Sequence, residues 1–355
     1  MDGQGNAARI SFRNDYSEGA HPRLLQALGR ASAEQNAGYG LDRHSERAAQ
    51  LIRQACAQPQ AAVHLLVGGT QTNLTAIAAF LRPHQAVVAV EAGHIATHET
   101  GAIEATGHKV LTVPALHDKL TPALIQPLLD VHTNEHMVQP RLVYISNSTE
   151  SGTIYTFAEL DALSRFCRAH DLLLYLDGAR LGAALTADGN DLDLPTIAAL
   201  TDAFYIGGTK NGALLGEALV IVNPDLQADF RYLVKQRGAL LAKGMLLGSQ
   251  FATLFEDGLF FELAAHANAM AQRLRAGLQA AGVQFTSDSP TNQQFIAVSA
   301  QQAAQLAQRY DFERWEVCAD GSHVIRFVTS WATTAASVDR LCADVATRAY
   351  ADARA

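Results

Sequence analysis

The chain has 355 residues, of which 48% are hydrophobic, and this is enough for one large domain and a smaller second one. Its formal net charge is −8, and no block of basic residues could neutralise phosphates, which argues against a nucleic-acid binder. Residues 1–10 lack an apolar signal core, and no apolar run reaches the roughly 18 residues of a membrane span. We therefore expect a cytoplasmic protein that binds neither nucleic acid nor membrane.

Seven short runs, almost continuously apolar, predict strands that are covered on both faces. They span 62–68, 86–91, 109–114, 141–146, 172–177, 203–208 and 218–222. Helical patterns lie between them, and Thr121 with Pro122, and Thr156 with Glu159, are typical of helix starts. The alternation predicts a mostly parallel α/β sheet, and the short link between the last two strands allows an antiparallel pair there.

After about residue 225 the pattern changes to that of a smaller α+β domain. Its main segments are a helical region at 226–281, strands at 291–299 and 322–331, and a terminal helix whose charges at 348–354 predict a solvated face. The division that we expect is an N-terminal segment 1–22, a large domain 23–245 and a small domain 246–355.

The four cysteines are scattered and form no CxxC pair. They are Cys56, Cys167, Cys318 and Cys342. This spacing favours buried or idle thiols in a reducing compartment over a disulfide or a metal site.

Ligands of open parallel sheets bind at the carboxyl ends of the strands, where one glycine pair is informative. In "LLVGGTQTNLTAIAAF", Gly68 and Gly69 follow a strand, and Thr70 adds a hydroxyl where a helix begins. Backbone amides and the helix dipole at such a turn can hold a phosphate. The pair is equally compatible with an ordinary tight turn, and it matches neither GxGxxG nor the Walker pattern, which disfavours a dinucleotide or a nucleoside triphosphate.

Asp177 ends the strand in "LLLYLDGARLGAAL", and Arg180 follows three residues later. An aspartate at the end of a buried strand is costly unless it is paired with a cation. One interpretation is a structural ion pair between Asp177 and Arg180. The other is that Asp177 faces a protonated ring nitrogen while Arg180 faces an anionic group.

Lys210 lies in "FYIGGTKNGALLGEALVIV", among glycines and apolar strands. Burial disfavours the ammonium form, which lowers the pKa of the lysine and makes the amine nucleophilic. An amine for a Schiff base, an aspartate for a pyridinium and a phosphate-binding turn are the three groups that pyridoxal phosphate requires. Their conjunction is more specific than any one of them.

With these residues in place, the sequence resembles the threonine aldolase family of pyridoxal-phosphate enzymes. The segments that carry the likeness are "GGTQTNL", "HIATHETGAIEATGHKV", "YISNSTESGT", "LDGARL", "FYIGGTK" and "KQRGALLAKG", between about residues 11 and 333. The family belongs to the β-eliminating-lyase group of the aspartate-aminotransferase-like fold. The resemblance implies fold type I, with a large, mostly parallel α/β domain and a small C-terminal α+β domain.

The resemblance also implies an activity and an assembly. The expected reaction is that of a carbon–carbon lyase, the cleavage of L-threonine-like or L-allo-threonine-like β-hydroxy-α-amino acids to glycine and an aldehyde such as acetaldehyde. The expected assembly is a homotetramer, a dimer of dimers, in which a neighbouring subunit completes each site. Another pyridoxal-phosphate reaction, β-elimination or transamination, is the alternative, and a cofactor-free binding protein is weakened by the retained residues.

Roles follow for the residues that match the family's motifs. Lys210 corresponds to the lysine that binds the cofactor covalently, Asp177 to the partner of its ring nitrogen and His94 to the imidazole that stacks on the ring. The remaining matches are Gly69 and Thr70 for the phosphate, Lys243 for the phosphate of a neighbouring subunit, Arg180 and Arg326 for the substrate carboxylate, and Asn14 with Asp15 at the border of the substrate.

One segment departs from the family. Many members carry a histidine after the fourth strand, in a Glu-Asn-Thr-His pattern that contacts the substrate hydroxyl, whereas this chain reads "SNSTES", with Thr149 and Glu150 there. The base that takes the hydroxyl proton is therefore left open among His94, Glu150 and a bound water.

The remaining polar and aromatic candidates receive structural interpretations. His94 and His98 lie one helical turn apart, but no matching third ligand accompanies them, so we expect no metal. We expect Glu99 and Glu104 to cap or solvate the same helix. Trp315 and Trp331 are predicted to lie in the core.

Overall fold

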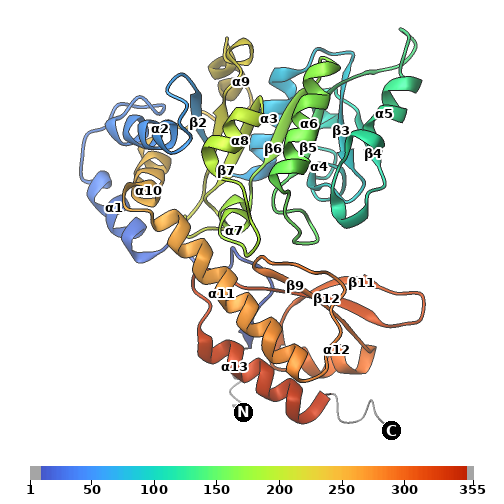
Figure 1. Cartoon of the computed structure of the whole chain (residues 1–355). Helices are drawn as coiled ribbons and strands as arrows, with labels where there is room; N and C mark the ends of the chain where they lie inside the picture. The colour runs from blue at the N-terminus through green and yellow to red at the C-terminus, as the bar shows by residue number, and fades with distance from the viewer. Residues whose placement is uncertain (1–8, 350–355) are drawn as a thin grey trace, which may run out of the picture.

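A seven-stranded sheet forms the centre of the larger of two lobes in the computed structural model, which describes residues 9–349 (Figure 1). Its strands are β2 (Ala62–Leu66), β3 (Gln85–Val90), β4 (Val110–Val113), β5 (Gln139–Ser146), β6 (Leu173–Asp177), β7 (Ala203–Gly207) and β8 (Glu217–Ile221). The order is β2-β8-β7-β6-β5-β3-β4, and only β8 runs antiparallel to its neighbours. The seven predicted strands are confirmed, as is the antiparallel pair at the 203–222 link.

The strands are apolar on both faces because each face packs against helices. Val143 and Ile145 point to one core, whereas Leu142 and Tyr144 point to the other. The first core is covered by α1 (Pro22–Ser32), α2 (Arg43–Ala55), α6 (Phe157–Ala169), α8 (Leu194–Leu200) and α10 (Met245–Glu256). The second is covered by α3 (Gly69–Phe80) and α9 (Phe230–Gln236). Burial on two sides thus explains the absence of a period-two pattern.

Short helices connect these elements. They are α4 (His94–Thr97), α5 (Pro122–Val131), α7 (Leu181–Leu185) and the 3₁₀ turns Glu104–Thr106, Leu116–Asp118 and Pro224–Leu226. The predicted capping box at α6 is confirmed: Thr156 Oγ1 accepts from the Glu159 amide at 3.3 Å, and Glu159 Oε2 accepts from the Thr156 amide at 2.8 Å. Pro122 begins α5 as predicted, although the Thr121 side chain makes no capping hydrogen bond.

The smaller lobe packs three antiparallel strands against helices. The strands lie in the order β11 (Glu313–Val317), β12 (His323–Val328), β9 (Gln293–Val298), and the helices are α11 (Leu259–Ala280), α12 (Ala300–Leu306), α13 (Ala335–Asp344) and the π-helical turn Val345–Ala349. Strands at 291–299 and 322–331 were predicted and are confirmed. The charged run "DFERWEV" concealed β11 from sequence analysis. Residues 350–354 of the predicted solvated face lie outside the described part of the chain.

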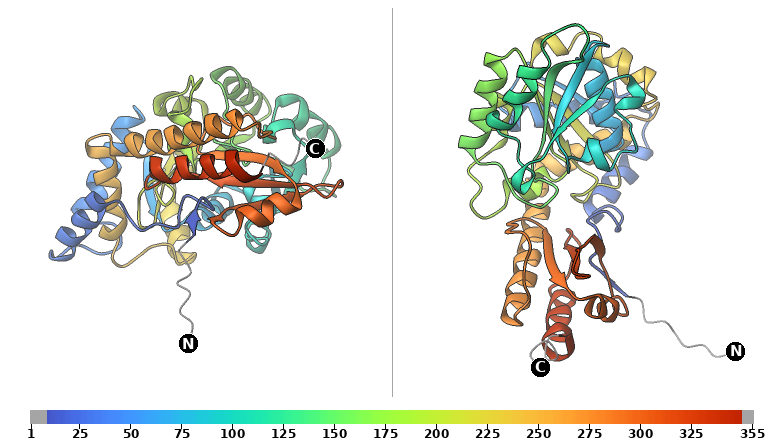
Figure 2. Two further views of the ribbon diagram at one scale, coloured as in Figure 1. Left: turned by 90° about the horizontal axis from the view of Figure 1, so that it is seen from below. Right: turned by 90° about the vertical axis from the view of Figure 1, so that its right-hand side faces the viewer.

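The N-terminal segment belongs structurally to the smaller lobe. β1 (Ile10–Ser11) pairs with β10 (Tyr310–Asp311), and Phe12 is fully buried in the core of that lobe. Figure 2 shows the segment running beside the smaller lobe before α1 joins the larger one. The chain therefore passes the junction of the lobes at residues 13–21, before α11 crosses it again. The domain limits given above stay a prediction.

None of the four cysteines forms a disulfide, as predicted. Cys56 and Cys167 are buried, and burial raises the pKa of each to about 12, so both are inert thiols. Within residues 9–349, no helix combines the length and the apolar character needed to cross a membrane.

A glycine allows a close approach between α10 and α2 in the larger lobe. α10 packs against α1 and α2, and a Cβ at Gly248 of α10 would overlap the backbone nitrogen and Cα of Ser45 in α2. The two backbones can approach this closely only without a side chain at that position.

We therefore expect Gly248→Ala to lower the free energy of unfolding by about 1–3 kcal/mol, because the helices must separate to admit the methyl group. Gly29→Ala in α1 is the matched control: a Cβ there meets nothing within 4 Å, and alanine favours a helix interior by about 0.5–1 kcal/mol. Urea denaturation of both variants measures the difference. Equal stability of the two would contradict this account of the contact.

Candidate active site

Four strand ends of the sheet deliver polar side chains to one cavity. His94 follows β3, Glu150 follows β5, Asp177 ends β6 and Lys210 follows β7. These residues line an inner cavity of about 360 Å³, together with the 68–70 turn after β2. An outer cavity of about 390 Å³ shares several of the same residues and extends to the smaller lobe. The cavity thus lies at the carboxyl edge of the sheet, where we expect a ligand to bind from the sequence.

Asp177 is a buried carboxylate held by several donors. Tyr144 Oη donates to it at 2.6 Å, Asn73 Nδ2 at 2.9 Å and the Ala179 amide at 3.0 Å. Burial acts to raise the pKa of Asp177, but the charge of His94 and the hydrogen bonds from Tyr144 and Asn73 outweigh burial and hold this pKa below its ordinary value. The site therefore keeps a negative charge at the base of the inner cavity.

Glu99 does not cap or solvate its helix, and that prediction was wrong. The side chain is buried, and its Oε1 accepts from Asn73 Nδ2 at 2.8 Å and contacts His94 Nδ1 at 2.7 Å. Asn73 therefore bridges the carboxylates of Glu99 and Asp177. Burial acts to lower the pKa of His94, but the hydrogen bond to Glu99 and the charges of Glu150 and Asp177 raise it above the ordinary histidine value.

Lys210 forms no ion pair within residues 9–349, and its Nζ lies 5.9 Å from the centre of the Tyr16 ring. Burial and the charge of Arg180 lower the pKa of Lys210, although the surrounding carboxylates act in the opposite direction. A lysine in this setting has a larger share of neutral, nucleophilic amine than a lysine in water.

The turn after β2 provides an anion site. Gly68 is the N-cap of α3 and has no side chain to cap it, so the first amides of the helix face the cavity beside Thr70. A Cβ at Gly69 would lie 3.1 Å from Tyr205 Oη, so no larger residue fits without movement. Ser148 Oγ, on the same cavity, is buried without a hydrogen-bond partner in the described structure. Free donors of this kind suit a phosphate.

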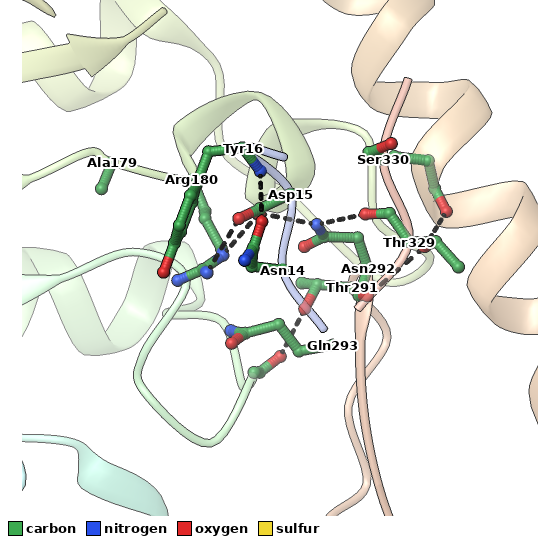
Figure 3. A network of polar contacts seen from close by, with 12 residues as sticks. Asn14, Asp15, Tyr16, Ala179, Arg180, Thr291, Asn292, Gln293, Thr329 and Ser330 are labelled. Carbon is green, nitrogen blue, oxygen red and sulfur yellow. Dashed lines mark hydrogen bonds and ion pairs between the residues drawn. The ribbon is translucent and has the colours of Figure 1, made fainter. Parts of the chain in front are cut away.

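Arg180 pairs with Asp15, not with Asp177, which corrects the ion-pair interpretation of the 177–180 segment. Its Nε donates to Asp15 Oδ2 at 2.7 Å and its Nη2 to Asp15 Oδ1 at 3.0 Å. Asn292 Nδ2 donates to the same Oδ2 at 2.9 Å and to the Thr329 carbonyl at 2.9 Å, as Figure 3 shows. The N-terminal segment, the larger lobe and the smaller lobe therefore meet at one buried carboxylate.

Arg326 projects from β12 into the outer cavity without a carboxylate partner within residues 9–349. Its Nη1 donates to Gln293 at 3.1 Å, its guanidinium carbon lies 4.6 Å from the centre of the Trp315 ring, and its Nε has no partner. Trp331 packs against the core as predicted, but the prediction for Trp315 was wrong, because this side chain lines the cavity beneath a guanidinium. A buried cation with an unused donor suits an incoming carboxylate.

Besides Asp15, which pairs with Arg180, two more predicted site residues, Asn14 and Lys243, line neither cavity of their own chain. Asn14 Oδ1 accepts from the Tyr16 amide at 3.0 Å and from Ser17 Oγ at 2.8 Å, so it stabilises the local turn while Tyr16 reaches the cavity. Lys243 is exposed, in the loop before α10. The roles of both residues stay predictions.

Sequence reasoning missed several residues of the site. Asn73 and Tyr144 are internal to an apolar helix and an apolar strand, where a single polar residue gives no pattern. A signal existed for Glu217, because an acidic residue in the apolar run "GEALVIV" needs a partner or a proton. Its carboxyl group lines the inner cavity.

The comparisons with known proteins agree with this geometry. A family model described as beta-eliminating lyase matches residues 12–301. A low specificity L-threonine aldolase of a Pseudomonas species is 33% identical over 341 residues, covering 94% of this chain and 96% of the relative. The Leishmania major threonine aldolase structure is 50% identical, with a TM-score of 0.93 over 95% of this chain and 98% of its own. A Thermus thermophilus aspartate aminotransferase matches at a TM-score of 0.72 and 15% identity, with 95% and 91% covered, which concerns the fold alone.

The fold is thus that of the aspartate-aminotransferase-like enzymes, the fold type I group, as the sequence predicted. The chain belongs to the beta-eliminating lyase family, and its likeness to threonine aldolases extends over nearly its whole length.

The contact between His94 and Glu99 gives a pH prediction. In Glu99→Gln the carboxylate that holds the protonated imidazole is lost while burial remains, so the pKa of His94 should fall and the ring should lose its proton at lower pH. NMR titration of the His94 ring measures this change. Glu104→Gln, at an exposed position nearby, should leave the titration unaltered. An unchanged His94 titration in Glu99→Gln would show that Glu99 does not set it.

Proposed function

We propose that this protein is a pyridoxal-phosphate-dependent aldolase that cleaves L-threonine-like β-hydroxy-α-amino acids to glycine and an aldehyde. The observation that carries the proposal is the unpaired Lys210, which shares one cavity with the buried carboxylate of Asp177 and the uncapped start of α3. The 50% identity to a Leishmania major threonine aldolase supports the same activity.

The residues of the inner cavity fit the cofactor. Lys210 would bind its aldehyde carbon, Asp177 would hold a proton on its ring nitrogen, and the turn at Gly69 and Thr70 would bind its phosphate. His94, which lines the same cavity, would pack on the ring. When bound, pyridoxal phosphate supplies a ring that accepts the electron pair released as the Cα–Cβ bond breaks.

The outer cavity fits the substrate carboxylate. Asp15 engages Arg180 through Nε and Nη2, and neither bond uses Nη1. Arg326 brings a second guanidinium from the smaller lobe, oriented by Gln293 and Trp315. Two cations on opposite lobes would fix the carboxylate and so set the direction of the bond to be broken.

Two side chains of the cavity are placed to take the proton of the β-hydroxyl group. Glu150 lines both cavities, and His94, in its neutral form with the proton on the Nδ1 that faces Glu99, has Nε2 as an acceptor. "SNSTES" thus brings a carboxyl group into the cavity where many relatives have an imidazole. We retain both residues, and a bound water, as alternatives.

We also propose a cytoplasmic homotetramer, a dimer of dimers, in which Lys243 of one subunit reaches the phosphate site of another. The support is its exposure on the loop before α10 together with its match to the family. Asn14 is proposed to border the substrate through the turn that it shapes.

A β-elimination or transamination on the same fold is the alternative function, because the matching family model is named for elimination. A panel of threonine, allo-threonine and phenylserine stereoisomers separates the two. Formation of glycine and aldehyde in equal amounts supports the aldolase. Formation of a keto acid with ammonia would indicate β-elimination, and transfer of the amino group to an added keto acid would indicate transamination.

The variant Lys210→Ala tests the covalent role. We expect loss of the visible absorbance of bound cofactor, of its borohydride-reducible link to the protein and of turnover, because no other amine is described in the inner cavity. Lys109→Ala, at an exposed position, is the control and should retain all three. A reducible link that persists in Lys210→Ala would assign the covalent role to another residue.

The variant Arg326→Ala tests the carboxylate contact. We expect kcat/KM to fall by about a hundredfold or more, while the cofactor absorbance and the melting temperature stay near those of the unaltered protein, since the guanidinium has no carboxylate partner of its own here. The control Arg273→Ala removes an exposed ion pair with Asp339 in the same lobe and should leave kcat/KM unchanged. A lower melting temperature with unaltered kinetics in Arg326→Ala would make Arg326 a structural residue.

A further inference from the structure

Glu217 is a buried carboxyl group next to the anion site at the start of α3. It begins β8 and pairs in register with Leu66 of β2 on one side and with Gly207 of β7 on the other. Leu66 is the last residue before the turn that leads into α3, so Glu217 lies beside that turn. It lines the inner cavity with Gly68 and Gly69 and is only 4% exposed.

The surroundings of Glu217 do not supply the cation that a buried carboxylate requires. Its Oε2 accepts from the Gly208 amide at 3.1 Å, the Thr209 hydroxyl lies close by, and no ion pair to Glu217 occurs within residues 9–349. One neutral amide and one hydroxyl compensate a buried negative charge poorly, so the neutral acid is favoured.

The charged and titratable groups that face Glu217 come from three elements. Lys210, in the link after β7, acts to lower the pKa of Glu217, and Asp177 of β6 acts to raise it. Tyr175 and Tyr205 lie on the same face of the sheet and stay neutral, since burial raises their pKa values well above ordinary. Burial outweighs Lys210 and raises the pKa of Glu217 to about 8.

We propose that Glu217, in its protonated form, donates a hydrogen bond to the phosphate of the cofactor, and that ionisation of Glu217 weakens phosphate binding. The inference rests on the proposed cofactor and assigns it a ligand beyond Gly69 and Thr70. A neutral acid offers an O–H donor to a phosphate oxygen, whereas a carboxylate repels the phosphate. The amides of α3 and the acid would then bind the phosphate from two sides.

The geometry favours the phosphate over Lys210 as the partner of Glu217. No ion pair joins Glu217 to Lys210, although both lie near the β7–β8 link. The register of β2 and β8 instead places Glu217 level with the last residue before the anion-binding turn. A role in setting the charge of Lys210 is the competing account, and it predicts an effect that does not depend on the phosphate.

The experiment measures the dissociation constants of pyridoxal phosphate and of pyridoxal, which lacks the phosphate, for the cofactor-free protein by equilibrium dialysis. Glu217→Gln is the informative variant, because its amide can accept from Gly208 and donate to the phosphate at every pH. Measurements run from about pH 7 to about pH 9.5, above the second ionisation of a phosphate ester near pH 6. Both ligands have the aldehyde and the ring, so a difference between them reports on the phosphate alone.

The expected result follows from linkage. The protein with protonated Glu217 binds the phosphate better. Its affinity for pyridoxal phosphate is therefore highest below the pKa of Glu217 in the free protein, about 8, and falls as pH rises above this value. For pyridoxal phosphate, the dissociation constant of the unaltered protein should rise at least about tenfold relative to Glu217→Gln by about pH 9.5. For pyridoxal, the ratio between the two proteins should stay constant with pH.

Each other outcome has a defined meaning. If the dissociation constant of pyridoxal phosphate changes with pH in the same way in the two proteins, the inference is overturned. If the two proteins differ with pH equally for pyridoxal, Glu217 acts on the charge of Lys210 and not on the phosphate. If Glu217→Gln does not fold, the unaltered protein alone decides, since the ratio of its two dissociation constants must change with pH. Failure of the unaltered protein to bind pyridoxal phosphate at any pH would overturn the proposed cofactor and not this role alone.

Discussion

The ionised carboxyl group of Asp177, buried at the end of a central strand, is the constraint on which the rest of the site depends. A lone carboxylate at this depth would take up a proton, because burial in a medium of low dielectric disfavours the charge. Hydrogen bonds from Tyr144 and Asn73, and the charge of His94, keep the pKa of Asp177 low. Tyr144 is held by β5, Asn73 by α3 and His94 by the turn after β3. The negative charge of the Asp177 carboxylate therefore depends on the folded sheet and its connections.

A second buried carboxylate, that of Asp15, ties the two lobes together. It accepts two hydrogen bonds from Arg180 of the larger lobe and one from Asn292 of the smaller lobe. Removal of Arg180 or of Asp15 alone would leave the other charge uncompensated, which typically costs about 3–5 kcal/mol. The pair also orients the guanidinium that is proposed to meet the substrate, so the contact that joins the lobes and the contact that positions a ligand share one side chain.

The sequence predicted the large elements because their signals are local and cumulative. Seven apolar runs became seven strands, and the conjunction of Lys210, Asp177 and the Gly68–Gly69 turn located the cavity at one edge of the sheet. It did not predict that Asp15 would meet Arg180, since 165 residues separate them and neither lies in a periodic pattern. Glu99 was misassigned for the same reason: a charged residue on a short helix is usually solvated, and only the fold shows that Asn73 and His94 cover it.

Asp177 and Glu217 show how one sheet face gives two carboxyl groups opposite protonation states. Both are buried and both lie near Lys210, so neither depth nor this cation distinguishes them. The charge of His94 and the number of donors do: Asp177 has the charge of His94 and several short hydrogen bonds, whereas Glu217 receives one amide at 3.1 Å beside a hydroxyl. The pKa is accordingly low for the first and about 8 for the second. The inner cavity therefore offers an anion, Asp177, for the protonated ring nitrogen of the proposed cofactor, and a neutral hydrogen-bond donor, Glu217, for its phosphate. Because the proposed cofactor carries its ring nitrogen and its phosphate at different positions of one ring, this difference in charge between the two carboxyl groups would favour one orientation of that ring in the cavity.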